Sequence, residues 1–460
     1  MKFASFIFLA LLTAFNIVFS QSSFQVVLGG LNQPTVFAFM PNGNIIVNQQ
    51  RDSAKIYNSV TGDKISCFWN FGDSCFYSGE TGLIGVCLDP QFSINHFVYI
   101  YYVSKDTSVN VVRLTELNNL GTNPVKIFRQ RRPNQGSFHV SGNIHFGPQN
   151  KLYFSVGDGG VSSNAQLLTN PFGKILRINT DGTAPADNPF YDDGNPATGN
   201  DDRIWAYGFR NTWDFTFSTF NDSLYASENG QTRNDEINFV RKGKNYGWPI
   251  CEGYCVPYNP LYRQPMDTIG GNGAFNYAPT GIVVYNGSVY PALNGKVITA
   301  NMQASGPVTG ILKYNLGNAP YNDTILSHEV ISPYLGTTLI QHTDGYLYLC
   351  RITTGQIVKL IPDPVGINNS QIPAEYKLHQ NFPNPFNPQT IIRFRVEKES
   401  NVRIEIFDIT GKKIAAPIDE KKGPGEYEVL WNADNLPSGV YFYRLTAGEF
   451  SEQKKMVLIK

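Results

Sequence analysis

A turn followed by an apolar strand recurs six times in this chain, and a second strand follows each one after another turn. The first strands of these pairs read NGNIIVNQQ, NHFVYIYYV, NKLYFSVGD, DSLYASENG, NGKVITANM and DGYLYLCR. Repeats about 50–70 residues apart with two strands each are typical of radial β architectures, because no unit can bury both of its faces alone. Since apolar residues at helical spacing are scarce, the repeats predict an all-β six-bladed β-propeller. A long pair of β-sandwiches is the alternative, but it would not explain the repeated strand pairs.

The sequence changes character near residue 363. Residues 363–374 (DPVGINNSQIPA) contain Pro, Asn and Gly and few apolar side chains, as expected of a linker. In the RIEIFDI segment beyond it, Ile404 and Ile406 alternate with charged residues, which marks a half-exposed antiparallel strand. IIRFRV, YEVLW, VYFYRL and KKMVLIK supply further strands. We therefore expect residues 375–460 to form a small Ig-like β-sandwich.

The N-terminus MKFASFIFLALLTAFNIVFSQSS has one early lysine, an apolar run and then small polar residues. This order is typical of a secretory signal peptide, with cleavage near Ser20–Gln21. An uncleaved membrane anchor is the alternative, but the run is short for a span. The sequence predicts a signal peptide at residues 1–20, a propeller at residues 21–362, and no transmembrane span in the mature protein.

The overall composition narrows the class of protein. Lysine and arginine together number 37, as do aspartate and glutamate, so no global basic field exists to attract nucleic acid. Aromatic residues make up 13% of the chain, which favours β structure and argues against disorder.

Six cysteines in an exported chain permit disulfides. CFWNFGDSC and CEGYC each bracket a short loop, which predicts the local pairs Cys67–Cys75 and Cys251–Cys255. Cys87 and Cys350 lie in strand-like runs, where either buried thiols or a third bridge would fit. The paired Cys/His spacing of a zinc site is absent from the sequence.

The C-terminal motifs closely resemble the C-terminal sorting domain of bacterial type IX secretion cargo. They are NFPNPFNPQTIIRFRV, IFDITGKKI, LPSGVYFYRLTAG and the terminal KKMVLIK. The resemblance implies that residues 375–460 engage the type IX secretion machinery, followed by their removal and by release or surface attachment of the protein. A generic Ig-like adhesion module is the alternative.

Phrases in the first part of the chain resemble the glucose/sorbosone dehydrogenase family. They are ETGLIGVCLDPQFSINHFVYIYYV, SFHVSGNIHFGPQNKLYFSVGDGG, NPFGKILRINTDGTAPADNPF, IWAYGFRNTWDF and SENGQTRNDEINFVRKGKNYGWP. The resemblance runs from Gly29 to Ile361 and is strongest between Thr81 and Pro249. Members are six-bladed propellers that use pyrroloquinoline quinone (PQQ), so the resemblance implies an aldose dehydrogenase that oxidises a sugar hydroxyl.

Such chemistry needs a base and a fixed cation. Oxidising a sugar hemiacetal to a lactone removes a hydroxyl proton, for which a histidine suits, and a hydride, which leaves negative charge on the quinone oxygen. By resemblance, His139 in HVSG is the base and Arg210 in GFRN faces the quinone oxygen. Gln50, Gln166 and Asn211 fall where the family surrounds the quinone. Ca²⁺ is the polarising ion that the family implies.

Plainer interpretations stand beside these assignments. His139 could be a hydrogen-bonded loop residue, and Arg210 could brace a loop. GDGG at 157–160 has the chemistry of a tight turn, and no helix pattern follows it to cradle phosphate. The loop DNPFYDDGNPATGNDD, residues 187–202, is rich in carboxylates and amides, the hard ligands of Ca²⁺. Its spacing matches no EF-hand, and a merely solvated acidic loop is the alternative.

The sequence departs from the family at two places. Phe138 precedes the histidine, where the family often has Asp or Asn. The family's lysine and arginines for the PQQ carboxylates are also missing, since YLGTTLIQHTDGYLYL offers only Thr337, Thr338 and His342, and Lys296 lies in a turn. Burying three carboxylates without cations is costly. A non-catalytic glycan- or protein-binding propeller is therefore the second hypothesis, and a Ca²⁺-dependent lactonase-like hydrolase the third.

Overall fold

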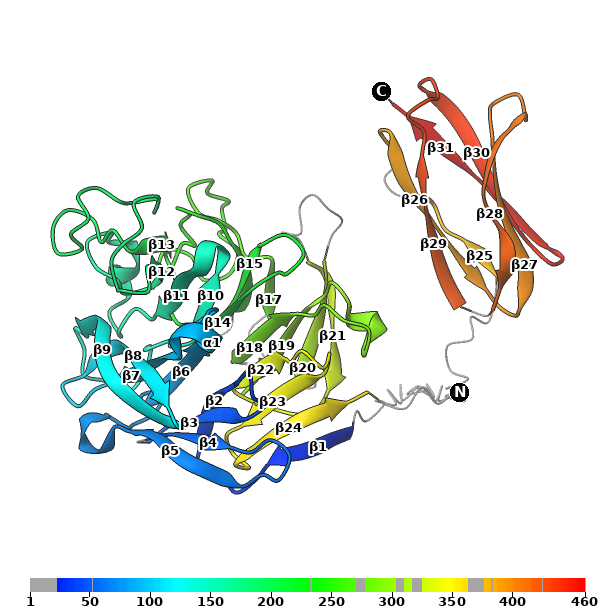
Figure 1. Ribbon diagram of the computed structural model, residues 1–460. Coiled ribbons are helices and arrows are strands. Elements are labelled where there is room, and N and C mark those ends of the chain that lie inside the picture. The colour runs from blue at the N-terminus through cyan, green and yellow to red at the C-terminus, as the bar shows by residue number, and fades with distance from the viewer. Residues whose placement is uncertain are drawn as a thin grey trace, which may run out of the picture. The chain divides into compact units, whose positions relative to one another are not determined.

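Short antiparallel strands make up nearly all of the regular structure (Figure 1). The computed structural model describes residues 23–459 except 52, 232–233, 270–277, 303–309, 317–324, 363–375, 382–383 and 424. It divides into two compact units, Met1–Asp363 and Pro364–Lys460. The predicted signal peptide and the predicted linker lie outside the described residues. The prediction of an all-β chain is confirmed.

The described part of the first unit contains six four-stranded sheets. Five are built from consecutive strands: β2 (Pro34–Phe39), β3 (Ile45–Gln49), β4 (Ser53–Tyr57) and β5 (Lys64–Asn70); β6 (Leu83–Leu88), β7 (Phe97–Val103), β8 (Ser108–Leu117) and β9 (Leu120–Arg131); β10 (Ile144–Gly147), β11 (Lys151–Val156), β12 (Lys174–Ile178) and β13 (Ile204–Tyr207); β14 (Thr212–Phe217), β15 (Leu224–Glu228), β16 (Asp235–Val240) and β17 (Asp267–Ile269); β18 (Pro279–Val284), β19 (Val297–Asn301), β20 (Ile311–Leu316) and β21 (Ile325–Ser332). The sixth has the order β1 (Ser23–Leu28), β24 (Gln356–Ile361), β23 (Leu347–Arg351) and β22 (Thr338–Gln341).

Six strands, one from each sheet, pack side by side: β2, β6, β10, β14, β18 and β22, which we call the first strands. β2 contacts β6, β6 contacts β10, and the series continues through β14, β18 and β22, which contacts β2 again. Apolar side chains fill the space between adjacent sheets; Tyr99 and Val111 of one sheet, for example, share a core cluster with Phe154 and Leu176 of the next. The strands read from the repeats are β3, β7, β11, β15, β19 and β23, the second strands of the five consecutive sheets and the matching strand of the last.

The first strand of the chain completes the last sheet. β1 pairs antiparallel with β24, with Ser23 opposite Ile361. Leu28 at the end of β1 is buried, and it shares a core cluster with Phe37, Ile45 and Ile357. Residues at the two ends of the first unit therefore hold the same sheet together.

Helical structure is confined to single turns in the described residues. They are α1 (Phe92–Asn95) and the 3-10 turns η1 (Gly72–Ser74), η2 (Pro148–Asn150), η3 (Ser162–Gln166) and η4 (Pro291–Leu293). None of the helices in the part of the chain that the structure describes has the length and apolar content to cross a membrane.

The disulfide predictions are half right. Cys251 and Cys255 are bonded, but Cys67 and Cys75 are not. Cys67 is exposed on β5 whereas Cys75 is buried in the core against the neighbouring sheet, so the two side chains lie in different surroundings. Cys350 is a buried thiol whose Sγ lies 3.3 Å from the Pro34 carbonyl oxygen, and burial raises its pKa to about 12. Since Cys87 is also unbridged, the third bridge is not formed.

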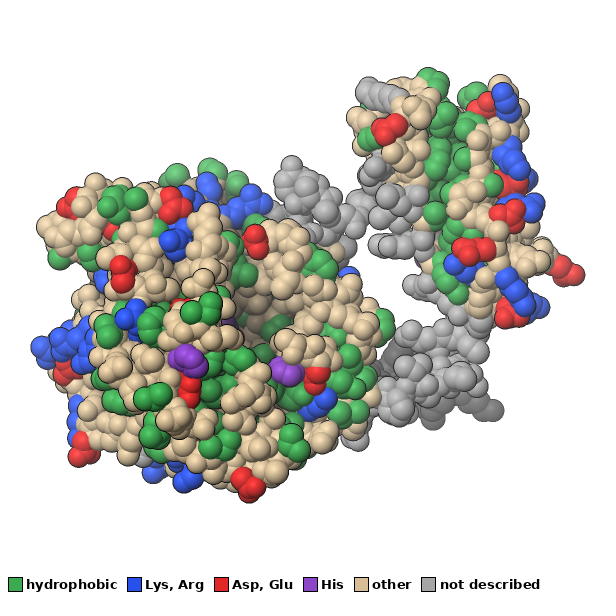
Figure 2. Space-filling view, viewed as in Figure 1, with side chains coloured by type: hydrophobic (Ala, Val, Ile, Leu, Met, Phe, Trp, Pro, Cys, Tyr) green, Lys and Arg blue, Asp and Glu red, His purple; other side chains and the backbone are tan. Residues whose placement is uncertain are grey.

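The second unit consists of two sheets over one core. One sheet has the order β25 (Lys377–Leu378), β26 (Gln389–Val396) and β29 (Gly425–Asn432); the other has β28 (Lys413–Lys422), β27 (Ser400–Phe407), β30 (Gly439–Ala447) and β31 (Phe450–Leu458). Ile404 and Ile406 are fully buried in this core while Arg403 is exposed, as the alternation predicts. The charged side chains of this unit gather along β27 and β28 (Figure 2), where Arg403 pairs with Asp419 at 3.0 Å.

Candidate functional site

His139 lies on the loop between β9 and β10, where the backbone adopts the left-handed region. His139, Ser141 and Gly142 have φ values of 57°, 53° and 143°. A side chain at Gly142 would lie 2.4 Å from the Ile84 Cδ1 atom, and one at Gly157 would lie 2.3 Å from the His139 carbonyl oxygen. The glycine of HVSG is therefore required by a close approach of three chain segments, and this approach fixes the position of the histidine.

The imidazole of His139 is held at both nitrogens. Its Nδ1 lies 2.7 Å from Asp158 Oδ1, and its Nε2 lies 2.8 Å from Arg210 Nη2. A guanidinium can only donate, so Nε2 accepts and the proton sits on Nδ1, where the carboxylate accepts it. The His139 side chain is 21% exposed and that of Asp158 is 2% exposed. Both partners thus select the tautomer whose lone pair is on Nε2, the nitrogen that a base would use.

Asp158 is the aspartate of the GDGG phrase, which the sequence suggested was only a turn. Its Oδ1 also accepts from the Gly160 N–H at 2.8 Å, and its Oδ2 accepts from Trp248 Nε1 at 3.0 Å. Its own N–H donates to the Arg210 carbonyl oxygen at 2.8 Å. The phrase does form a turn, and that turn also carries the acceptor for His139.

Arg210 stands between β13 and β14 and is anchored through its backbone. The N–H groups of Arg210 and Asn211 donate to Glu228 Oε1 at 2.8 and 2.6 Å, and Thr212 Oγ1 donates to Glu228 Oε2. The Arg210 Nη1 donates to the Asn229 carbonyl oxygen at 2.9 Å. The buried Glu228 carboxylate and the Asn229 carbonyl oxygen accept all of these hydrogen bonds. They fix the backbone of Arg210 and its Nη1, which leaves Nη2 directed at His139.

Two buried carboxyls behind Arg210 have altered acidity. Burial raises the pKa of Glu228 to about 7, although three protein donors favour its charged form. Burial and, next, repulsion from Glu228 raise the pKa of Glu236 to about 8. The interior next to the arginine can therefore hold a proton near neutral pH.

Asn211 joins the histidine loop to a third segment. Its Oδ1 accepts from the Ser141 N–H at 3.0 Å, and its Nδ2 donates to Glu80 Oε2 at 3.2 Å. The same Glu80 oxygen accepts from the His139 N–H at 2.8 Å. Burial raises the pKa of Glu80. Asn211 and Glu80 thus position the backbone of His139.

The side-chain amides of the two predicted glutamines also form hydrogen bonds within the protein. Gln50 Nε2 donates to the carbonyl oxygens of Gly79 at 2.7 Å and Thr81 at 2.9 Å, which flank Glu80. Gln166 Nε2 donates to the Trp248 carbonyl oxygen at 2.6 Å, and its Oε1 accepts from Asn245 Nδ2 at 2.7 Å. The glutamines thus bond to the backbone beside Glu80 and at Trp248, next to the residues that hold His139. The cofactor contacts of Gln50, Gln166 and Asn211 stay predictions.

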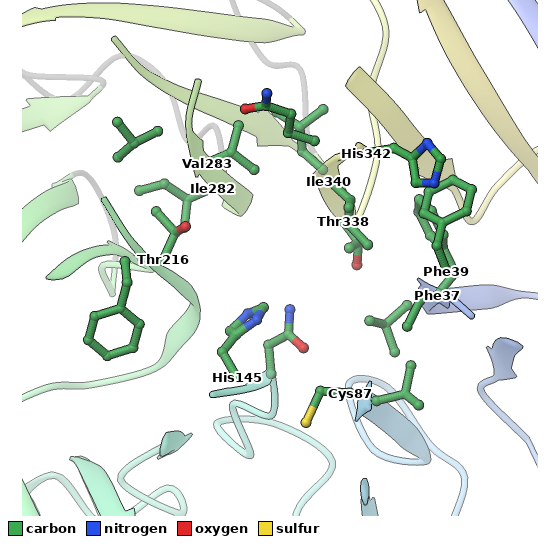
Figure 3. A pocket seen from close by; sticks show the side chains of 18 of the residues that line it. Phe37, Phe39, Cys87, His145, Thr216, Ile282, Val283, Thr338, Ile340 and His342 are labelled. Atoms are coloured by element: carbon green, nitrogen blue, oxygen red, sulfur yellow. The ribbon is translucent and has the colours of Figure 1, made fainter. Parts of the chain in front are cut away.

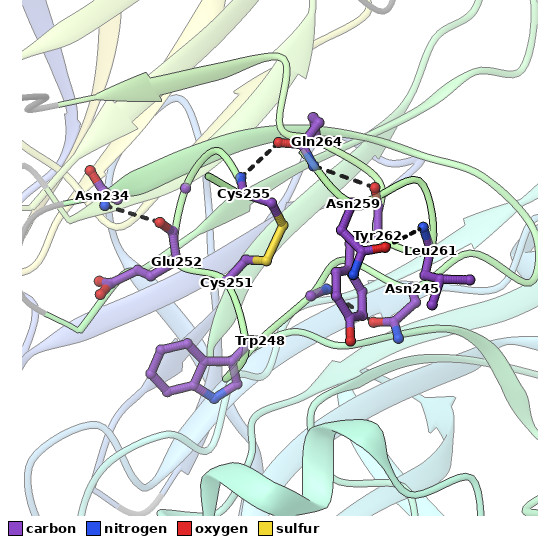
Figure 4. Close-up of a disulfide and its surroundings, with 12 residues drawn as sticks. Asn234, Asn245, Trp248, Cys251, Glu252, Cys255, Asn259, Leu261, Tyr262 and Gln264 are labelled. Carbon is purple, nitrogen blue, oxygen red and sulfur yellow. Dashed lines mark hydrogen bonds between the residues drawn. A yellow bond between two sulfur atoms is a disulfide. The ribbon is translucent and has the colours of Figure 1, made fainter. Parts of the chain in front are cut away.

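The loop after Trp248 is closed by the disulfide between Cys251 and Cys255 (Figure 4). The Cys255 N–H donates to Gln264 Oε1 at 2.8 Å, and Asn234 Nδ2 donates to the Glu252 carbonyl oxygen at 3.1 Å. The bridge therefore tethers the segment that presents Trp248 to Asp158.

A separate cavity of about 580 Å³ opens at the other end of the first strands. It is lined by side chains from all six of them, including Phe37, Cys87, His145, Thr216, Ile282 and Ile340, which surround an open centre (Figure 3). His145 Nε2 lies 2.7 Å from Asp214 Oδ1, which joins β10 to β14. His342 lines this cavity too, at a ring distance of 4.0 Å from Phe39, so it does not belong with His139.

Two threonines stand at the start of β22 in the last sheet. Thr337 Oγ1 and Thr338 Oγ1 both donate to the Thr35 carbonyl oxygen, at 2.7 and 2.8 Å. Arg351, at the end of β23, stacks over the rings of Phe24 and Tyr334 at 5.1 and 5.4 Å. Arg351 is a cation of this sheet that the sequence analysis did not weigh, so the shortage of cations for a PQQ carboxylate stays a prediction.

The sequence analysis did not assign three residues to the site that the structure places there: Asp158, Glu80 and Trp248. Asp158 follows a strand end and is flanked by glycines, a signal that fits a turn and a site equally. Glu80 carries no local signal, because its partners lie 59 and 131 positions further along the chain. Phe138, which replaces a polar residue of the family pattern, is 60% exposed. Asp158 fills the role of tautomer-setting acceptor that Phe138 lacks.

Comparison with known proteins gives two family matches. The Glucose / Sorbosone dehydrogenase model matches residues 31–359, and the Secretion system C-terminal sorting domain model matches residues 380–460. The aldose sugar dehydrogenase of Escherichia coli is 28% identical over 360 residues, covering 74% of this chain and 92% of that protein. Quinoprotein glucose dehydrogenase B of Acinetobacter calcoaceticus is 30% identical over 262 residues, covering 50% of this chain and 53% of that protein.

Solved structures agree with these matches. The PQQ-bound aldose sugar dehydrogenase of Streptomyces coelicolor is 26% identical, with a TM-score of 0.61, and covers 74% of this chain and 98% of that one. The apo form of the Escherichia coli enzyme is 23% identical, with a TM-score of 0.63 and 74% and 100% coverage, a likeness of fold.

Proposed function

Because the chain belongs to the glucose/sorbosone dehydrogenase family, we propose that it is a sugar dehydrogenase that oxidises a hydroxyl of an aldose with PQQ as the electron acceptor. The observation that carries this proposal is the line from Asp158 through His139 to Arg210, with contacts of 2.7 and 2.8 Å. It combines a base of defined tautomer with a cation at the nitrogen where the proton would arrive. The relatives named as aldose sugar dehydrogenases support the substrate class.

His139 Nε2 would take the hydroxyl proton of the sugar while Asp158 stabilises the imidazolium through Nδ1. Arg210 donates to Nε2 in the resting site, so its Nη2 must release that nitrogen as the sugar binds. Its guanidinium is then free to face the negative charge that develops on an oxygen beside it. Trp248 and Gly160 keep the Asp158 carboxylate in place throughout.

PQQ would supply the carbonyl carbon that receives the hydride. Its quinone end fits the residues present: Arg210 has a buried Nε without a partner among the described atoms, and its guanidinium lies 5.7 Å from the Trp248 ring centroid. By the resemblance, the carboxylate end would be held by residues of the last sheet, where this chain has Thr337 before β22 in place of the family's cations. We expect weaker PQQ binding than in relatives that carry those cations.

Ca²⁺ is part of the proposal through the family, and no step above depends on it. The oxygens of Glu228 and Glu236, the buried carboxylates beside Arg210, already accept hydrogen bonds from Arg210, Thr212, Asn238 and Gly253. A polarising ion would have to share these oxygens with their present donors.

We also propose that the six sheets are the blades of a six-bladed β-propeller and that the second unit is an Ig-like sandwich. The closed series of contacts from β2 to β22 and the shared cavity support the propeller. The sorting-domain match supports passage by type IX secretion after removal of residues 1–20, to the medium or the cell surface. Deleting residues 375–460 should retain the protein inside the producing cells, as fractionation would measure.

The decisive experiment is titration of the purified mature chain with PQQ in the presence of Ca²⁺, followed by absorbance and calorimetry. Aldose-dependent dye reduction would be assayed in parallel. Saturable PQQ binding with turnover that His139→Ala abolishes, while PQQ binding persists, would support the dehydrogenase. His342→Ala, at the other end of the first strands, serves as the matched control and should retain turnover.

Failure to bind PQQ up to roughly millimolar, an affinity of only about −4 kcal/mol, would overturn the redox function. The engaged hydroxyls of Thr337 and Thr338 would then favour the non-catalytic binding propeller, to be screened on glycan arrays. Turnover of lactones without PQQ would instead indicate the lactonase-like hydrolase.

A further inference from the structure

The acidic loop between β12 and β13 gathers three carboxylates from its two halves. Oxygens of Asp192, Asp193 and Asp202 all lie within 4.8 Å of one another. Asp202 Oδ1 accepts from the Asp192 N–H at 2.6 Å, and Asp192 Oδ2 accepts from the Asn200 N–H at 2.8 Å. The loop thus folds back on itself and brings residues ten positions apart into one cluster. None of these residues takes part in the site around His139.

One buried carboxylate of this cluster has an oxygen that makes no hydrogen bond among the described atoms. Asp202 is 0% exposed, and its Oδ2 has no hydrogen-bond partner among the described atoms. An oxygen of Asp202 lies within 4.8 Å of oxygens of Asp192 and Asp193, so the Asp202 carboxyl group faces the cluster. A buried carboxylate oxygen without a partner is costly, which indicates that something absent from the bare protein satisfies it.

The protein supplies no positive charge to this cluster. Among the described residues, none of the ion pairs involves Asp192, Asp193 or Asp202. The nearby cations are committed elsewhere: Arg203 pairs with Asp201 at 2.7 Å, and Arg177 pairs with Asp187 at 2.7 Å. Three carboxylates at this spacing repel one another unless a cation or a proton is present.

We propose that Asp192, Asp193 and Asp202 bind a Ca²⁺ ion that holds the loop of residues 187–202 closed. The donors are all hard oxygens, which suits Ca²⁺ or Mg²⁺ and not Zn²⁺ or copper. A loop that supplies three carboxylates in an irregular arrangement suits Ca²⁺ better, because Mg²⁺ demands near-octahedral geometry and keeps most of its waters. The site is distinct from the polarising ion of the proposed catalysis.

A proton is the competing occupant. Carboxylates bind a metal ion in their deprotonated form. Ca²⁺ and protons should therefore compete, so Ca²⁺ affinity should fall as the pH is lowered and binding should release protons. This competition offers a readout that does not depend on enzyme activity.

Terbium luminescence tests the proposal on the full mature chain without PQQ. Tyr191, next to Asp192 and 38% exposed, can sensitise a Tb³⁺ ion bound in the loop. We expect saturable emission that Ca²⁺ displaces, and affinity lowered by roughly tenfold or more in Asp202→Asn, as for loss of a metal-site group. Asp181→Asn is the matched control, since Asp181 is an exposed acid bonded to Thr183 in the preceding turn; it should leave binding unchanged.

Two further measurements keep the result unambiguous. His139→Ala should retain the Tb³⁺ signal, which separates this site from the proposed catalysis. Asp193→Asn should also weaken binding, and circular dichroism in a chelator would verify that each variant is folded. Emission that is insensitive to both Asp202→Asn and Asp193→Asn would overturn the proposal. So would the absence of Ca²⁺ binding up to about 10 mM, above the range of weak extracellular sites.

Discussion

At the scale of single residues, neighbours from different loops set the tautomer and the orientation of the His139 imidazole. Asp158 accepts from Nδ1 and Arg210 donates to Nε2, so the ring has one allowed tautomer before any ligand arrives. Asp158 is in turn held by Trp248. The base is therefore prepared by its surroundings and needs no substrate to orient it.

Replacing Asp158 with Asn tests this preparation. An asparagine can turn its amide nitrogen towards Nδ1, which would place the imidazole proton on Nε2 and remove the lone pair that accepts the sugar proton. We expect kcat to fall by about 10²–10⁴-fold, the usual contribution of general base catalysis, with PQQ binding little changed. Stopped-flow dye reduction measures the first and absorbance titration the second. An unchanged kcat would mean that Asp158 only shapes the loop.

The buried carboxyl of Glu236 should make stability depend on pH. Its pKa of about 8 in the folded chain exceeds the ordinary value of 4.5. The folded state therefore holds a proton that the unfolded state has lost between these values. Its contribution is complete below pH 4.5 and is lost as the pH rises through 8, by at most about 1.4 kcal/mol per pH unit.

Urea unfolding between pH 5 and 9 measures this dependence. Glu236→Gln should flatten it, most clearly between pH 7 and 8, since Glu228 titrates at about 7. Glu329→Gln, at an exposed glutamate of β21 paired with Lys313, is the control and should leave the slope unchanged. Equal slopes in all three proteins would contradict a buried, protonated Glu236.

The candidate site was only partly predictable because its partners are far apart in the sequence. His139 and Arg210 sit in distinctive phrases, whereas Glu80 reaches His139 across 59 positions. Asp158 was visible but was explained by turn chemistry alone, and nothing local separates a turn aspartate from one that also faces a histidine. The burial that raises the pKa values of Glu228 and Glu236 exists only once the sheets pack together.

At the scale of elements, the disulfide holds the loop that begins with Trp248. The bridge closes a loop of only five residues. By restricting the unfolded chain, it should stabilise the folded state by about 2 kcal/mol. The double variant Cys251→Ser, Cys255→Ser should lose about that much stability and, by loosening Trp248, lower kcat. Thermal melts and dye reduction measure both. Cys67→Ser, at an exposed thiol, is the control; if it has the same effect, the bridge has no special role.

The strands that were predictable are those that are buried along their whole length. β3, β11, β15, β19 and β23 are buried or nearly so at every position, and their apolar runs stand out. The outer strand β9 has no such signature, since seven of its twelve positions are exposed. The bond predicted between Cys67 and Cys75 failed for the same reason, since spacing alone does not reveal that one cysteine points outwards and the other into the core.

At the scale of the whole molecule, the pairing of β1 with β24 should govern the stability of the first unit. Leu28 is 1% exposed between the first and last sheets, whereas Val26 on the same strand is 44% exposed. Leu28→Ala should lower the free energy of unfolding by about 2–5 kcal/mol, the cost of a cavity in a packed core. Val26→Ala should change it by less than about 0.5 kcal/mol. Urea unfolding measures both free energies. Similar values for the two variants would show that β1 does not govern the stability of the first unit.

The same strand pair has a consequence for synthesis. Ser23 and Ile361 meet in one sheet, although more than three hundred residues of chain are made between them. A chain whose translation stops early has no β24 to receive β1, and a chain trimmed at its start leaves β24 paired with β23 alone. The last sheet can therefore form with all four of its strands only in a chain that retains both ends of the first unit.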